Sequence, residues 1–124
     1  MNRMISKENV PAFQSLMNTL QSLLSRDYQA RQWVAREGSG ISSCFYNDTL
    51  YFLEDSDALI EAYEAGRVEM TDKQYQMLKK LYEMVDEYDD LMDRPRTDEG
   101  IVNDPRWGKV REYAKVVYEE LKKH

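Results

Sequence analysis

The pattern of apolar and polar positions is clearest between residues 71 and 94, where it predicts a long amphipathic helix. Thr71 and Gln74 have the spacing of a capping box, in which each side chain accepts a hydrogen bond from the other residue's backbone N–H. Arg94 precedes Pro95, and proline pushes its predecessor out of the helical conformation. Between these marks the apolar residues recur at helical spacing and share one face: Tyr75, Leu78, Leu81, Tyr82, Val85, Tyr88 and Met92.

Two further stretches show the same periodicity at the two ends of the chain. Residues 9–25 predict a first helix with Asn9 as its cap and Pro11 in its first turn, where a missing N–H costs little. Residues 26–38 either continue this helix with a bend or form a separate one that ends at Gly38. Asp104 and Pro105 begin a last helix with an apolar stripe: Trp107, Val110, Ala114, Val117 and Leu121.

The middle of the chain is less regular. Residues 44–46 and 49–53 have strand-like composition with a turn at 47–48, but Asp48 could equally cap a short helix. We favour the helix because an isolated hairpin is marginal in water. Ser56 or Asp55 then caps another short helix that ends at Gly66. The prediction is an all-α, single compact domain of about five helices over residues 1–124, with a hairpin in 41–53 as the alternative.

The composition of the chain limits the classes of partner and site that it can have. The 124 residues contain 23 Asp and Glu against 17 Lys and Arg, a net charge of −6. This balance argues against binding nucleic acid or anionic membranes, and fits a cationic protein partner, a divalent metal or simple solubility. The only cysteine is Cys44 and the only histidine is His124, which excludes internal disulfides, multi-thiolate sites and histidine-based triads. We see neither a signal peptide nor a membrane span, and expect a soluble cytoplasmic protein without catalytic residues or cofactors.

Carboxylates along the long helix form the first candidate site. Glu83, Asp86, Glu87, Asp90 and Asp93 are grouped away from the apolar face, and we call them the acidic strip. Charge of one sign accelerates encounter with an oppositely charged partner. The alternative is an ordinary solvated helix face. We interpret the strip as a candidate partner-binding surface.

A second candidate uses four carboxylates on two consecutive predicted helices. Glu61, Glu64, Glu83 and Asp86 resemble the E-x-x-E…E-x-x-D pattern of the all-α NTP pyrophosphatases. The resemblance implies that these residues hold Mg²⁺ through oxygen ligands, leaving positions for substrate phosphates. This enzyme is our alternative function, although 23 acidic residues produce such spacing easily by chance.

Three further residues are expected to belong to the hydrophobic core and not to a functional site. Trp33 and Trp107 fall on apolar stripes, so we expect both to be buried. Cys44 has no histidine or cationic neighbour in the sequence to lower its pKa, and we interpret it as a buried, inert thiol.

The half of the chain from residue 57 onward resembles small bacterial immunity proteins of polymorphic-toxin and contact-dependent growth inhibition systems. The likeness is carried mainly by one segment, whose matching residues are Asn103, Asp104, Pro105, Trp107, Val110 and Ala114. It implies a mostly helical, acidic, cytoplasmic protein that neutralises a cognate toxin domain by occluding its active site. The partner would be a protein toxin, which the net charge suggests is cationic. The resemblance assigns no binding residues, so the acidic strip is proposed on charge alone.

Overall fold

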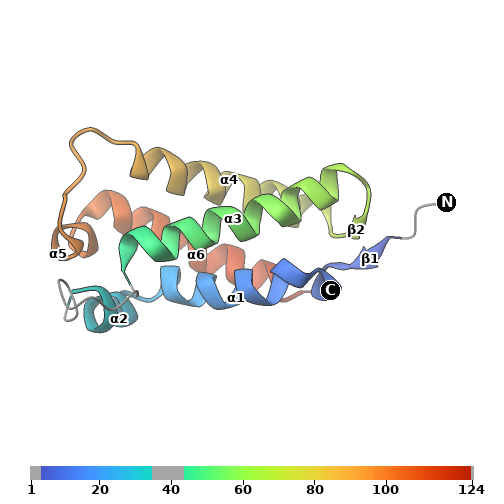
Figure 1. Ribbon diagram of the computed structural model, residues 1–124, viewed down its shortest axis with the longest axis horizontal. Helices are drawn as coiled ribbons and strands as arrows, with labels where there is room; N and C mark the ends of the chain where they lie inside the picture. The colour runs from blue at the N-terminus through green and yellow to red at the C-terminus, as the bar shows by residue number, and fades with distance from the viewer. Residues whose placement is uncertain (1–3, 35–43, 124) are drawn as a thin grey trace.

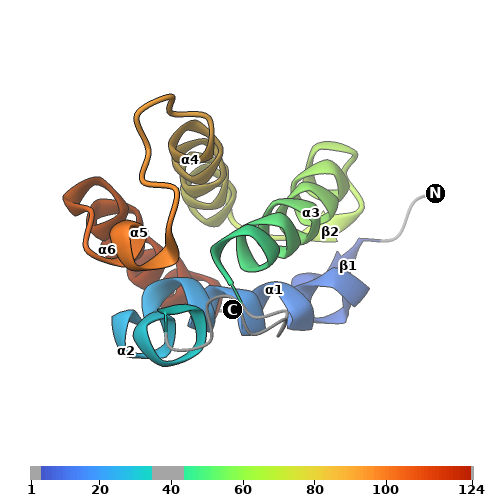
Figure 2. The same cartoon turned by 60° about the vertical axis from the view of Figure 1, so that its left-hand side comes forward.

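Four long helices form the body of the fold: α1 (Pro11–Leu24), α3 (Phe45–Glu64), α4 (Asp72–Asp89) and α6 (Pro105–Leu121). The computed structural model describes residues 4–34 and 44–123. Helix α1 packs against α3 and α6, and α4 packs against the same two helices. The four therefore form a ring in which successive helices run antiparallel (Figure 1 and Figure 2). The predicted all-α fold is confirmed.

Shorter elements close the two ends of this bundle. Strands β1 and β2 pair in parallel, with Ile5 opposite Val68. The buried Lys7 donates a 2.6 Å hydrogen bond from Nζ to the carbonyl of Lys123, which ties the first described segment to the last. The short elements are β1 (Ile5–Ser6), the 3₁₀ turn η1 (Lys7–Asn9), α2 (Arg26–Gln29), the π-helical turn η2 (Ala30–Val34), β2 (Val68–Glu69) and α5 (Asp98–Val102).

The predicted starts of α4 and α6 are confirmed. Thr71 Oγ1 accepts from the Gln74 N–H at 3.0 Å, and Gln74 Oε1 accepts from the Thr71 N–H at 3.1 Å, which completes the capping box. Asp104 Oδ1 accepts from the Arg106 N–H at 2.9 Å, with Pro105 in the first turn. Both caps satisfy N–H groups that the helices leave without a backbone acceptor.

The N-terminal helix starts one residue later than predicted. Pro11 is its first residue, but the cap is Val10, and Asn9 belongs to the preceding 3₁₀ turn. The helix ends at Leu24, because Ser25 is extended and its hydroxyl accepts from the Tyr28 N–H to start α2. The second segment is therefore separate from the first. Its predicted end at Gly38 lies outside the described residues.

Helix α3 corrects the prediction for the middle of the chain. One continuous helix runs from Phe45 to Glu64, so the hairpin alternative is wrong over the described part of 41–53. Cys44 is its cap and is only half-buried, with Sγ accepting from the Asn47 N–H at 3.5 Å. Asp48 and Ser56, both predicted as caps, are buried inside the helix. Burial of Phe45, Phe52 and Leu59 along one side of this helix outweighs the local capping preference of Asp48 and Ser56.

Helix α4 ends at Asp89, five residues before the predicted end at Arg94. Its last turns carry several carboxylates, which are unfavourable at the negative end of the helix dipole. Met92, predicted to lie on the buried face, is 93% exposed in the turn that follows.

The segment after Pro95 contains the short helix α5. Its Thr97 hydroxyl accepts from the Gly100 N–H at 3.1 Å, and Ile101 and Val102 are buried. Strands β1 and β2 were not predicted, because two residues are too few to show an alternating pattern.

Aromatic side chains fill the core at the end of the bundle where α3 and α6 begin. Trp33, Phe45, Tyr88 and Trp107 form one cluster, in which Phe45 and Trp107 each contact the other three rings at centroid distances of 5.2–6.0 Å. Both tryptophans are fully buried, which confirms their predicted place in the core. Among the described helices, none combines the length and apolarity needed to cross a bilayer.

Candidate partner-binding surface

The acidic strip lies on the outer surface of α4 and on the turn after it. All five of its residues are exposed. Helix α3, which packs beside α4, contains six acidic residues and no lysine or arginine. Asp57 of α3 and Asp86 of α4 both lie near Tyr82, whose pKa is raised by burial and by these two carboxylates. The strip is therefore one side of a wider acidic face that spans α3 and α4.

Most of the strip's charge is not neutralised within the fold. Asp93 forms an ion pair with Arg106, with Oδ1 and Nη1 3.0 Å apart. No described cation forms an ion pair with the other four carboxylates of the strip: Glu83, Asp86, Glu87 and Asp90. These groups remain free to attract a cationic partner.

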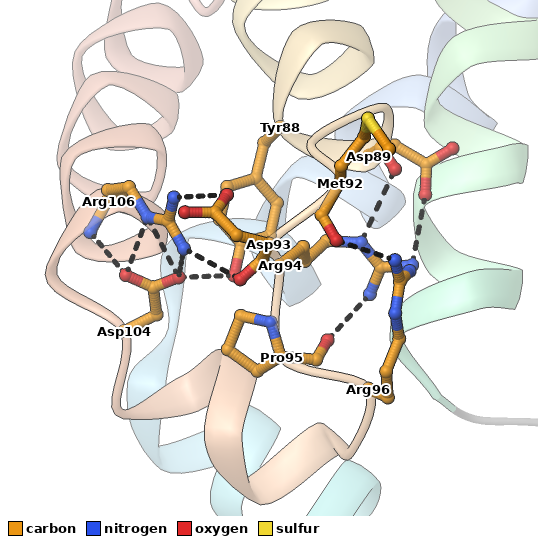
Figure 3. A network of polar contacts seen from close by, with 9 residues as sticks. All are labelled: Tyr88, Asp89, Met92, Asp93, Arg94, Pro95, Arg96, Asp104 and Arg106. Atoms are coloured by element: carbon orange, nitrogen blue, oxygen red, sulfur yellow. Dashed lines mark hydrogen bonds and ion pairs between the residues drawn. The ribbon is translucent and has the colours of Figure 1, made fainter.

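A partly buried hydrogen-bond network anchors the end of the strip (Figure 3). Tyr88 donates its hydroxyl proton to Asp104 Oδ2 at 2.9 Å, and Arg106 Nη2 lies 3.1 Å from the same oxygen. Burial raises the pKa of Tyr88, and its hydrogen bond to Asp104 adds to that shift. Burial pushes the pKa of Asp104 upward, but its hydrogen bonds to Arg106 and Tyr88 outweigh this, so the pKa is lowered. Asp104 is therefore an ionised acceptor that links α4 to α6.

Arg94 stabilises the turn after α4 through hydrogen bonds to backbone carbonyls (Figure 3). Its Nη1 donates to the carbonyl of Pro95 at 3.0 Å, its Nε donates to the carbonyl of Asp89 at 3.3 Å, and its guanidinium lies 4.9 Å from the Phe45 ring centroid. Arg96 donates to the Met92 carbonyl at 3.0 Å. These contacts fix the backbone from which Met92 extends into solvent beside the acidic strip.

The four carboxylates of the pyrophosphatase alternative are not assembled into a metal site. Glu61, Glu64, Glu83 and Asp86 are all exposed. Glu64 instead accepts from the hydroxyl of Tyr75 and lies 3.7 Å from Lys79 Nζ. Among the described residues, no group of three or more histidine, cysteine or acidic side chains is placed to hold a metal ion. The spacing therefore does not lead to the geometry that this alternative requires.

Comparison with known proteins gives no match from which the role of this surface could be inferred. No protein-family model, curated protein or solved structure matches the chain. The likeness to immunity proteins accordingly rests on the segment around Asp104 and Trp107, both of which are buried. These two residues explain the start of α6 and its packing, and neither is available to a partner.

The sequence did not reveal the polar groups that are buried in the core. Asp48 Oδ2 accepts from Trp33 Nε1 at 2.8 Å, and Gln29 Oε1 accepts from Trp107 Nε1 at 3.0 Å. Burial raises the pKa of Asp48, against the opposing effect of its hydrogen bonds from Trp33 and Tyr28. The one available signal was that Asp48 falls three residues after Phe45, in the register of the buried face. Both groups satisfy indole N–H donors, which is a structural role.

Proposed function

We propose that this chain is a protein-binding inhibitor of the immunity type, which neutralises a cognate toxin domain in the bacterial cytoplasm by covering its active site. One observation carries the proposal: four of the five carboxylates of the acidic strip are exposed and have no ion-pair partner among the described residues. A toxin domain that binds nucleic acid presents cations to phosphate groups. An acidic face competes for those cations and so blocks access of the substrate.

Exposed apolar side chains at the end of the strip complete the proposed interface. Met92 is 93% exposed, and Tyr46, which follows Phe45 at the start of α3, is 67% exposed. Charge at the rim of an interface mainly increases the association rate, whereas desolvated aromatic and apolar anchors slow dissociation. In this mechanism the strip brings the toxin to the surface, and Tyr46 and Met92 hold it there.

The test compares two double charge reversals that change the net charge equally. Asp86→Lys with Asp90→Lys alters the strip, and Asp27→Lys with Glu69→Lys alters exposed carboxylates on α2 and β2. Tagged protein is used to capture partners from lysate of the native organism, and the captured partner is then titrated by calorimetry. We expect one stoichiometric partner whose toxic activity is inhibited, with affinity reduced at least about tenfold by the strip variant, or about 1.4 kcal/mol.

The control variant should retain wild-type affinity, and both variants should unfold at the wild-type urea concentration because exposed charges contribute little to stability. Equal binding by wild type and the strip variant would show that the strip is not the interface. A captured partner with no toxic activity would contradict the immunity role itself.

A further inference from the structure

The other side of α4 carries a surface of different chemistry. Three adjoining hollows of about 520, 480 and 230 Å³ follow the groove between α4 and α6. Val116 lines the first and second hollows, and Met84 lines the second and third, so they form one continuous groove. None of the five residues of the acidic strip except Glu87 lines it.

The groove has an apolar floor with the periodicity of a helix-packing surface. Met77 and Met84 of α4 and Leu91 of the turn after it recur every seven residues, and each lines at least one of the hollows. On the α6 side the lining residues extend from Arg106 to Glu120, which at about 1.5 Å per residue is about 21 Å, or about four turns of helix. On the α6 side, Tyr113 is partly buried and Val116 is 51% exposed. A seven-residue apolar repeat is the spacing that a second helix uses to pack alongside.

The rim of the groove is cationic, although the whole molecule is acidic. Six lysine and arginine side chains line the hollows against four glutamates, in a chain with a net charge of −6. Lys80 Nζ lies 4.9 Å from the Tyr113 ring centroid, at the edge of the apolar floor. Lys109 and Lys115 form no ion pair with any described residue. Lys80, Lys109 and Lys115 are therefore available to carboxylates of a partner. Lys73 and Lys123 instead pair with Glu120, and Arg106 pairs with Asp93 and Asp104.

We propose that the α4–α6 groove binds an amphipathic helix of a partner protein, whose apolar stripe is flanked by acidic residues. The length and seven-residue repeat of the floor fit a helix of about four turns, and the lysine rim selects acidic flanks. This is a second binding surface that shares only Glu87 with the acidic strip, and it does not depend on the proposed immunity function.

The test uses two labelled synthetic helical peptides with the same leucine stripe, one flanked by glutamate and the other by lysine. Fluorescence anisotropy with the full chain should show binding of the glutamate peptide and at least about tenfold weaker binding of the lysine peptide. Lys109→Glu with Lys115→Glu should reverse this preference, and Val116→Asp should abolish binding of both peptides. The matched control, Arg31→Glu with Arg67→Glu, reverses two cations outside the groove and should leave the preference unchanged.

Three outcomes would overturn the proposal: no binding of either peptide, equal binding of both, or a preference unaffected by the groove variants. Sedimentation of the chain alone tests the competing occupant, a second copy. A concentration-dependent dimer that Val116→Asp abolishes would show that the groove is occupied by another copy instead. Asp86→Lys with Asp90→Lys should leave peptide binding unchanged, which separates failure here from failure of the immunity function.

Discussion

The hydroxyl of Tyr88 donates a 2.9 Å hydrogen bond to Oδ2 of Asp104, the residue that caps α6. This contact joins the last turn of α4 to the first turn of α6, and both partners are buried. Tyr88→Phe keeps the ring but removes the donor to an ionised acceptor. We expect a loss of about 1–3 kcal/mol in the free energy of unfolding. Urea denaturation measures it, and Tyr82→Phe, which alters a partly exposed tyrosine on the same helix, should cost much less.

Burial of Asp48 predicts a specific pH dependence of stability. The pKa of the Asp48 carboxyl is higher in the folded state than in the unfolded chain. As the pH rises above about 4, the carboxyl therefore loses its proton in the unfolded chain before it does so in the folded state. The contribution of Asp48 to stability is therefore fully present at low pH and is lost as the pH rises through the folded-state pKa. Asp48→Asn keeps an acceptor for Trp33 but cannot ionise.

The measurement for Asp48 is the difference in unfolding free energy between Asp48→Asn and wild type across the acid range. As the pH rises, the variant should become more stable relative to wild type. The change in relative stability should be about 1.4 kcal/mol for each pH unit by which burial raises the pKa of Asp48. A difference that stays constant with pH would contradict the assigned shift. Asp55→Asn, on the same helix, is the comparison for a less buried carboxylate.

Ser56 is fully buried, and its hydroxyl has no hydrogen-bond partner among the described residues. Ser56→Ala removes an unsatisfied polar group and adds a better helix former, so we expect a gain of about 1 kcal/mol. Thr49 provides the matched contrast, because its hydroxyl donates to the carbonyl of Phe45 at 2.7 Å. Thr49→Val should be destabilising. Thermal denaturation compares the two variants, and a melting temperature lowered by Ser56→Ala would contradict the prediction.

Two glycines should respond to alanine in opposite directions. A Cβ at Gly100 would lie 2.8 Å from Cβ of Pro95 and 3.1 Å from the capping hydroxyl of Thr97. Because the proline ring is rigid, we expect Gly100→Ala to cost about 1–3 kcal/mol. A Cβ at Gly108, inside α6, would meet only the flexible end of Arg111 at 3.6 Å. Gly108→Ala should therefore stabilise by about 0.5–1 kcal/mol, and chemical denaturation measures both variants.

Features governed by neighbouring residues were predictable from sequence. The Thr71–Gln74 capping box and the Asp104–Pro105 start each depend on side chains within three residues of the backbone that they satisfy. Exposure of Glu83, Asp86 and Glu87 likewise followed from helical periodicity, whereas Asp90 and Asp93 lie beyond the end of α4.

Features governed by packing between distant segments were not predictable. Ser56 has the local chemistry of a cap, but contacts across the bundle keep it inside a longer helix. The hydrogen bonds of Asp48 with Trp33, and of Gln29 with Trp107, join residues 15 and 78 positions apart. The apolar groove could be predicted only with the knowledge that α4 and α6 are neighbours. Periodicity reports which side of a helix is apolar, and does not report which helix covers it.

The contacts of Arg94 have a consequence for how quickly a partner dissociates. Its guanidinium binds two backbone carbonyls and lies over an aromatic ring, so the turn that carries Met92 and Asp93 is ordered before any encounter. A surface that is already in its bound conformation loses little freedom when a complex forms. Complexes formed by this end of the strip should therefore be long-lived, and Arg94→Ala should shorten their residence time although Arg94 itself is largely shielded from solvent.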